Sequence, residues 1–151
     1  MALTAVVLLP VLLLMLTAVL ELGLLRVTAA RARAAADLAV VVAINDQDDD
    51  ELARTGRLRP SADAAGVART YFALNLEPFA GALAASPASV GAAADVMVFP
   101  DPPSVDPRTH ARYERPVVRI AADVPIRTAV LGALLGRPVT TVTVHAASAP
   151  R

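Results

Sequence analysis

The sequence predicts an α+β protein in which a long N-terminal transmembrane helix continues into a small head with a short antiparallel or mixed β-sheet. Residues 2–20 contain no charged side chain, and an apolar run of about 18 or more residues can cross the hydrocarbon core of a bilayer as a helix. Residues 26–45 follow without Gly or Pro and are rich in Ala and Arg, which favour helix. Alternating β-branched stretches near the C-terminus predict strands.

The length of 151 residues suggests one domain in addition to the anchor. We expect residues 1–25 to form the transmembrane half of the N-terminal helix, residues 26–45 its projecting half, and residues 46–151 the α+β head. Hydrophobic residues make up 56% of the chain but aromatic residues only 3%. Because few large rings are present to fill it, the core of the head should be modest.

A helix of about 44 residues spans roughly 65 Å, about twice the bilayer core. Its second half must therefore project into water or lie on the head. Apolar residues spaced three or four apart mark one apolar face of that half. They are Val27, Ala30, Ala34, Leu38, Val41 and Val42.

Two residues of the apolar run are unusual. Pro10 lies in the middle of the run, where proline removes a backbone hydrogen bond; it is either a tolerated kink or a functional feature. Glu21 lies near the end of the run, where its carboxylate either reaches lipid headgroups or makes a specific assembly contact. A cleaved signal peptide is disfavoured because no positive charge precedes the run and Glu21 and Arg26 interrupt its end.

An acidic segment follows the long helix. Asp46, Asp48 and Asp50 alternate like the first ligands of an EF-hand calcium loop. That loop needs Gly at its sixth position and Glu at its twelfth, where this chain has Glu51 and Arg57. We therefore expect a solvated acidic loop, with a short helix over 50–56 that ends at Gly56.

The head should begin with a second helix over 61–75, with Ser61 as its N-cap and with Tyr71 and Phe72 in the core. Residues 76–90 are rich in small residues, Pro and Gly, and give no clear assignment. A strand is expected over 96–99. The proline-rich segment 100–115 should then form a rigid exposed loop, either a plain connector or an interaction loop.

The C-terminal third predicts two strands and a short helix. Residues 116–126 should form a strand with Val118 and Ile120 on one side and Arg119 on the other. Residues 128–136 should form a short apolar helix or turn that ends in Gly, and residues 139–145 the clearest strand of the chain. The last residues, from 146 on, should fray.

No pattern in the chain indicates catalysis or a cofactor. The sequence contains no cysteine, and its 14 basic and 14 acidic residues balance without a basic stripe for nucleic acid. Phosphate-binding loops, zinc signatures and nucleophile elbows are missing, and His110 and His145 have no spaced ligand partners. We therefore expect no enzyme, no metal, no cofactor, no nucleic acid and no small-molecule substrate.

Both ends of the sequence resemble the TadE/TadG-like proteins, the minor pilins or pseudopilins of tight-adherence (Tad) pilus systems. In VVLLPVLLLMLTAVLELGLLR, Pro10, Glu21 and Gly23 match the family's proline near the start and its acidic residue followed by glycine. The segment ARARAAADLAVVVA is similar to the family's Ala-rich continuation. The tail DVPIRTAVLGALLGRPVTTVTVHAASA is similar to its final strand, short helix and strand. The middle of the chain matches only in character.

The resemblance implies a pilin-like fold and a structural or assembly subunit of a Tad-type, type IV-like pilus or secretion apparatus. Its partners would be the membrane and other pilus or pilin-like subunits, including copies of itself. Pro10, Glu21 and Gly23 are then the candidates for assembly or helix packing. The alternative is a bitopic envelope protein whose extracytoplasmic head binds another envelope component through residues 100–115.

One departure concerns topology. Pilin-type members carry a short leader before the apolar helix, whereas this sequence starts at Met1 within the run. Arg26, Arg31 and Arg33 follow the run, so the positive-inside rule alone would place the head in the cytoplasm. A basic leader before Met1 would reverse that orientation. We therefore expect a single-pass protein of the inner membrane with an extracytoplasmic head, and a surface filament as its assembled form.

Overall fold

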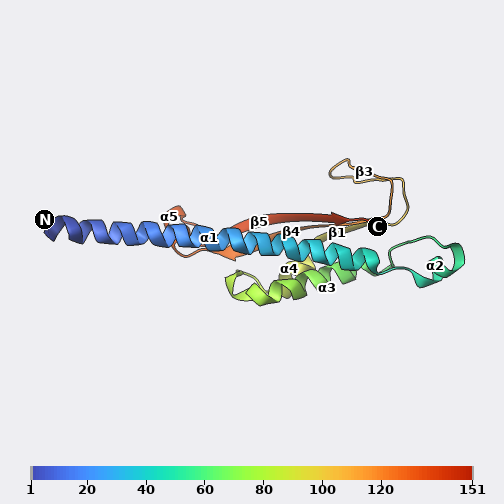
Figure 1. Ribbon diagram of the computed structural model, residues 1–151, viewed down its shortest axis with the longest axis horizontal. Helices are drawn as coiled ribbons and strands as arrows, with labels where there is room; N and C mark the ends of the chain where they lie inside the picture. The colour runs from blue at the N-terminus through green and yellow to red at the C-terminus, as the bar shows by residue number, and fades with distance from the viewer. Residues whose placement is uncertain (1, 151) are drawn as a thin grey trace.

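A computed structural model describes residues 2–150 of this chain, with side chains for residues 8–134 and 136–150. Its longest element is α1, Ala2–Asn45, a helix of 44 residues that continues through Pro10. Figure 1 shows that the N-terminal part of α1 projects alone, whereas the rest of the chain packs along its other part. The α+β layout is confirmed: a long apolar N-terminal helix precedes a small head with an antiparallel sheet.

Short helices form the first part of the head. They are α2 (Asp49–Thr55), α3 (Ala64–Leu76), the 3-10 helix η1 (Glu77–Ala82) and α4 (Pro87–Ala93). The short acidic helix is present as predicted: the Asp48 side chain caps it by accepting a hydrogen bond from the Glu51 N–H. Gly56 ends it with a φ of 70°, a left-handed conformation that glycine adopts at low cost.

The main sheet has three antiparallel strands in the order β1-β4-β5. They are β1 (Asp95–Phe99), β4 (Val117–Arg127) and β5 (Val139–Ser148). The predicted helix between the last two is α5, Val130–Leu135, with Gly136 as its left-handed C-cap. Two-residue strands β2 (Ser104–Val105) and β3 (Arg112–Tyr113) pair with each other in a separate hairpin.

The predicted fraying after residue 145 is wrong. β5 continues to Ser148, which lies opposite Val118, and the side chain of Ala146 is buried. The small residues of this segment favour no strand by propensity. They are held in β5 because β4 is long enough to supply backbone partners along the whole segment.

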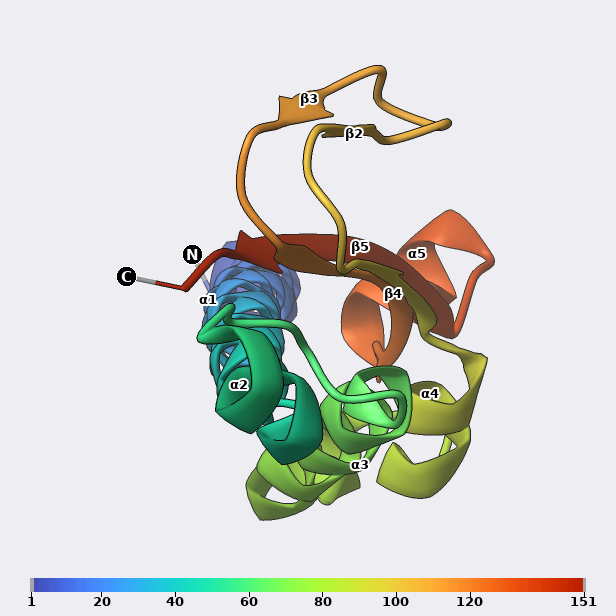
Figure 2. The ribbon, with the colours of Figure 1, turned by 90° about the vertical axis from the view of Figure 1, so that its right-hand side faces the viewer.

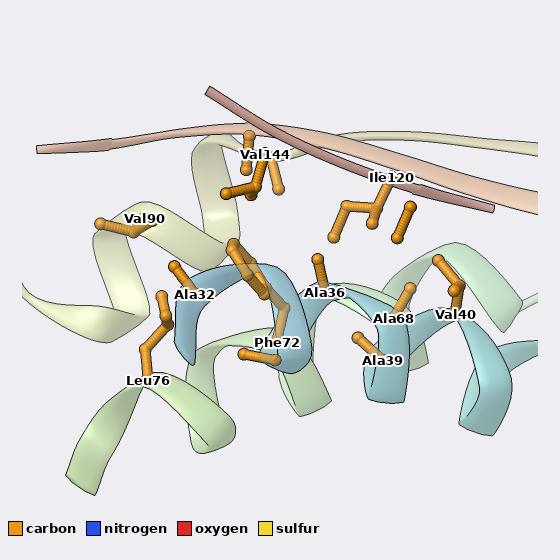
Figure 3. Packing of buried hydrophobic residues seen from close by; sticks show 14 of the residues in the cluster. Ala32, Ala36, Ala39, Val40, Ala68, Phe72, Leu76, Val90, Ile120 and Val144 are labelled. Carbon is orange, nitrogen blue, oxygen red and sulfur yellow. The ribbon is translucent and has the colours of Figure 1, made fainter. Parts of the chain in front are cut away.

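The elements form three layers, with the main sheet in the middle, helices on one face and the β2–β3 hairpin on the other (Figure 2). Figure 2 views the molecule along α1 and shows α1, α3 and α4 below the sheet and the β2–β3 hairpin above it. The core lies between the sheet and the helices, as the close-up in Figure 3 shows. Phe72 of α3 is its largest fully buried side chain, surrounded by aliphatic residues of α1, α3, α4 and the sheet.

The apolar face marked in the second half of α1 is not the face that packs on the head. Leu38 and Val41 are 55% and 44% exposed, and Val27, Ala30 and Ala34 are exposed as well. The buried face consists mainly of small residues, namely Thr28, Ala32, Ala35, Ala36, Ala39, Val40, Ala43 and Ile44. Both faces repeat every three or four residues, so spacing alone could not separate them. Small side chains are buried because they let α1 approach α3 and the sheet closely.

Two details of α3 also differ from the prediction. Ser61 does not cap the helix; its hydroxyl hydrogen-bonds to the Asp46 carboxylate, and α3 begins at Ala64. Phe72 is fully buried as expected, but Tyr71 is largely exposed and lies outside the core. Adjacent residues of a helix point about 100° apart, so one helix cannot bury both rings against the same neighbour.

Candidate assembly surface on the N-terminal helix

The first half of α1 carries an apolar surface that no other part of the described chain covers. Between Leu8 and Leu24 its large aliphatic side chains are 43% to 68% exposed, and none of them is buried. α1 is the one helix among the described residues that is long and apolar enough to cross a membrane. Isolated exposed leucines are common on proteins, but a continuous exposed patch of this size marks a membrane or protein contact.

The polar group in the middle of this surface is satisfied within the helix. The Thr17 hydroxyl donates a hydrogen bond of 2.6 Å to the Leu13 carbonyl one turn earlier. This local bond removes the need for a water molecule or another side chain as partner. The segment can therefore enter an apolar environment without leaving that hydroxyl unpaired.

Glu21 has a partner inside its own chain. Its carboxylate accepts hydrogen bonds from the backbone N–H groups of Ala129 and Leu131, the second at 2.6 Å. These are among the first N–H groups of α5, which have no partner within that helix. A carboxylate at this position also complements the positive end of the helix dipole. The sequence suggested headgroups or an assembly contact for Glu21, and the α5 cap is a third arrangement.

Gly23 and Pro10 are exposed on the same helix. A Cβ atom added at Gly23 would have no neighbour within 4 Å, so packing inside this chain does not require glycine there. Glycine in a helix interior is less stable than alanine by roughly 1 kcal/mol. The three candidate residues are thus not brought into one cluster: Glu21 contacts α5, whereas Gly23 and Pro10 remain open.

Apolar exposure continues along the second half of α1 and onto α3. Val27, Leu38 and Val41 are exposed on α1, and Leu74 is exposed on α3. A groove of about 370 Å³ lies between α1 and the junction of α3 with η1, lined by Arg31, Ala34, Ala35, Leu38, Asn75, Pro78 and Phe79. The helix therefore presents an apolar face over most of its described length.

A cluster of charged residues fastens the β2–β3 hairpin to the opposite face of the sheet. Arg119 of β4 is almost fully buried; its Nε lies 3.1 Å from Asp106 Oδ2 and its Nη2 lies 3.1 Å from Asp95 Oδ2. Arg108 Nη1 adds a contact of 2.8 Å to the same Asp95 oxygen. Segment 100–115 was expected to be an exposed loop, and this is wrong for Asp106, which is completely buried.

The charge of Asp106 is supported by its surroundings. Burial opposes that charge, but the N–H groups of Arg108 and Thr109 donate to the carboxylate and Arg119 attracts it. Together these contacts hold the pKa of Asp106 below its ordinary value of 3.8. At neutral pH the Asp106 carboxyl group is therefore ionised.

An open cleft of about 830 Å³ lies at the end of the head far from the N-terminus. It is lined by Glu51, Gly56, Arg57, Leu58, Arg59, Pro100, Asp101, Pro102, Arg115, Pro116 and Pro150. The side chains of Arg59 and Asp101 form an exposed ion pair of 3.1 Å across it. Arg57 and Arg115 make no ion pair with any side chain that the structure describes.

The residues that could suggest chemistry do not come together. Within residues 2–150, no group of three His, Cys, Asp or Glu side chains is arranged to hold a metal ion. His110 lies in the β2–β3 hairpin and His145 on β5, and both are exposed. Asp46 and Asp48, which suggested a calcium loop, bond instead to Ser61 and to the start of α2.

Sequence reasoning missed the partners of two carboxylates. Glu21 bonds across 108 residues to backbone groups, which leave no pattern of side chains in a sequence. Arg119 was placed correctly on the face of β4 opposite Val118 and Ile120, and an arginine that becomes buried needs an acidic partner. The choice of Asp106 depended on how the hairpin folds back.

Comparisons with family models, with curated proteins and with solved structures give no match to this chain.

Proposed function

We propose that this chain is a structural or assembly subunit of a Tad-type pilus or secretion apparatus, anchored in the membrane or polymerised through α1. One observation carries the proposal: the apolar surface of α1 has no partner in the described chain, although the helix is continuous with the core of the head. Lipid covers such a surface before assembly, and helices of neighbouring copies can cover it afterwards. The resemblance of both sequence ends to TadE/TadG-like proteins supports this assignment.

The exposed small residue on α1 fits the same proposal. Helices in a membrane gain little from apolar contact alone, because lipid tails are equally apolar. They associate where small residues let the backbones approach, and Gly23 offers such a place. Pro10, exposed in the same half, would shape the helix for its neighbours, and Glu21 would enter the assembly with its charge already paired to α5.

Association of the purified full-length chain tests the proposal. After detergent is removed, electron microscopy and sedimentation should show filaments or long oligomers. Gly23→Leu should abolish them while the circular dichroism of the head stays unchanged, since a larger side chain separates the helices. Gly81→Leu is the matched control, because Gly81 is also exposed with no neighbour within 4 Å of an added Cβ.

A protein that remains monomeric under all these conditions, or a Gly23→Leu variant that assembles as well as Gly81→Leu, would contradict assembly through α1. Topology is tested separately. A reporter fused after Arg151 should be active outside the cytoplasm, and activity confined to the cytoplasm would contradict an extracytoplasmic head.

The second candidate is a bitopic envelope protein whose head binds one other envelope component. The cleft beside the proline-rich segment favours it, because Arg57 and Arg115 there leave two cations available to an acidic partner. Under this alternative, replacing both arginines with serine should abolish capture of a single envelope protein. Under the pilus proposal the same variant should still assemble.

A further inference from the structure

We propose that residues 127–138, which comprise α5 and its flanks and are here named the α5 foot, rest on the membrane surface and bind anionic phospholipid headgroups. The inference rests on the proposed function, since it requires α1 to be inserted in a bilayer. It adds a second membrane contact, made by a segment of the head that lies more than 100 residues after the transmembrane segment.

The position of the α5 foot follows from the length of the apolar run. Residues 2–20 are 19 uncharged residues, which span about 28 Å as a helix, close to the thickness of the hydrocarbon core. The boundary between lipid tails and headgroups therefore lies near Glu21. Because Glu21 bonds to the N–H groups of Ala129 and Leu131, α5 lies at the same level. Figure 1 shows α5 as the part of the head nearest to the projecting half of α1.

The side chains of the α5 foot suit an interface. Leu134 is 58% exposed, and Val130 and Leu131 are partly exposed. Apolar side chains at the boundary of a bilayer are buried among headgroups and the first acyl carbons, as they are in interfacial helices. At this level of the molecule, an exposed leucine that would face water in a soluble protein faces lipid instead.

The α5 foot is held in shape before it meets a membrane. Gly136 ends α5, and the Arg137 N–H donates to the Gly132 carbonyl at 2.8 Å. The Thr128 N–H donates to the Pro138 carbonyl at 2.9 Å, which closes the base of the segment. A six-residue helix is too short to be stable alone. These contacts and the Glu21 cap supply the order that such a helix lacks, so little further ordering is needed on binding.

The charge of the α5 foot selects the lipid. Arg127 and Arg137 flank α5 and are exposed, and Arg26 is exposed on α1 five residues beyond Glu21. Residues 124–151 contain no Asp or Glu. Asp123, just before this stretch, accepts a hydrogen bond from the Thr143 hydroxyl, and Glu21 is bonded to α5. Arginine near an anionic membrane surface strengthens binding by about fivefold per residue. The structure thus assigns anionic headgroups, rather than neutral ones, to this surface.

Fluorescent labels at single cysteines test the α5 foot, because the chain has no cysteine of its own. The full-length variant Leu134→Cys carries an environment-sensitive dye and is inserted into vesicles of phosphatidylcholine with and without phosphatidylglycerol. Quenchers attached to lipid near the headgroup should reduce its emission, and a water-soluble quencher should have little access. Leu58→Cys is the matched control, because Leu58 is also an exposed leucine, 45% exposed, on the far end of the head.

A third label separates the failure of this inference from the failure of the proposed function. Leu12→Cys reports whether α1 is inserted. Suppose that the lipid quencher reduces emission from the label at position 12, whereas the water-soluble quencher reduces emission from position 134 as strongly as from position 58. That result overturns the membrane contact of the α5 foot alone. If the water-soluble quencher reduces emission from the label at position 12, α1 is not inserted, and both the membrane anchor and the membrane contact of the α5 foot are overturned.

The lipid preference has its own test. Replacing both Arg127 and Arg137 with glutamine should remove most of the increase in lipid quenching at Leu134 that phosphatidylglycerol produces, since two arginines together give about a 25-fold effect. Unchanged lipid dependence in that variant would overturn the assignment to anionic headgroups.

Discussion

The two halves of α1 differ in which side chains they expose and which they bury. In residues 8–25 the large aliphatic side chains lie on the surface, whereas in residues 26–45 the buried face consists mostly of alanines and the larger Leu38 and Val41 are exposed. Hydrophobicity alone therefore does not determine which side chains are buried within the chain. On the buried face, the many small side chains let the head approach α1 closely.

The difference gives each half its own partners. The alanine face of the second half contacts α3, β4 and β5 and belongs to the core. The first half meets the rest of the described chain mainly through Glu21, which binds α5. One helix can thus belong to a folded domain over one half and remain available to lipid or to other copies over the other.

The largest effect is expected from enlarging the alanine face. Ala36→Leu should lower the free energy of unfolding of the head by about 3 kcal/mol, because Ala36 is fully buried in the core and a larger side chain would overpack it. Thermal unfolding in mild detergent, followed by circular dichroism, measures it. Leu13→Ala in the exposed half is the control and should change stability by less than about 0.5 kcal/mol. Equal effects of the two substitutions would contradict the comparison.

Replacing glycine with alanine should lower stability at the crowded Gly91 and raise it at the open Gly23. Gly91→Ala should destabilise the head by about 2 kcal/mol, because the new Cβ would lie 2.8 Å from both Ala73 Cβ and the Arg69 carbonyl oxygen. Gly23→Ala should instead stabilise its helix by about 0.7 kcal/mol, since nothing lies within 4 Å of its Cβ. Unfolding of the first variant and amide exchange near residue 23 in the second measure these changes. Destabilisation by Gly23→Ala in monomeric protein would contradict the open environment of Gly23.

Removal of the hydrogen bonds from Glu21 to the head should have a smaller, local effect. Glu21→Ala should destabilise α5 by about 1 kcal/mol, as the loss of an N-terminal cap does. Hydrogen exchange of the Ala129 and Leu131 amides should accelerate, because the Glu21 carboxylate is their acceptor. Glu77→Ala is the control, an exposed acidic residue away from α5. Unchanged exchange at both amides would show that the cap is not formed.

Acid should act on the β2–β3 hairpin of the head through Asp106. The pKa of Asp106 is lowered in the folded chain, so its contribution to stability is complete above its ordinary value of 3.8 and is lost as the pH falls through the lower folded value. Below pH 3.8 the β2–β3 hairpin should loosen, with nuclear magnetic resonance shifts of the Arg108 and Thr109 amides. Asp106→Asn should abolish this titration, and a transition centred above 3.8 would contradict the lowered pKa.

The features that the sequence predicted correctly are those with strong local signals. The long helix, the short helix over 49–55 and the strands β1 and β4 follow from composition, a cap and alternation. The packing face of α1 could not be predicted, because two faces share the same spacing and the choice depends on how closely α3 approaches. The extension of β5 to Ser148 likewise depends on the length of β4.

The sequence alone could identify the residues of the candidate assembly surface, but it could not predict which residues they contact. Pro10, Glu21 and Gly23 stand out because proline, a charge and glycine are unfavourable within an apolar helix. The bond from Glu21 to α5 depends on the fold bringing residues 21 and 129 together, which no local pattern encodes. The same holds for Asp106, whose burial against Arg119 results from the return of the hairpin over the sheet.

The packing of β5 on α1 also determines the order in which the chain can fold during synthesis. The first half of α1 needs nothing from the described remainder of the chain to enter a bilayer, so it can do so while the ribosome is still producing the head. The alanine face of the second half must wait, because β4 and β5 come last among the strands and contacts so distant in sequence form slowly. Insertion at that stage would keep the exposed apolar surface of the first half out of water while the head is still incomplete.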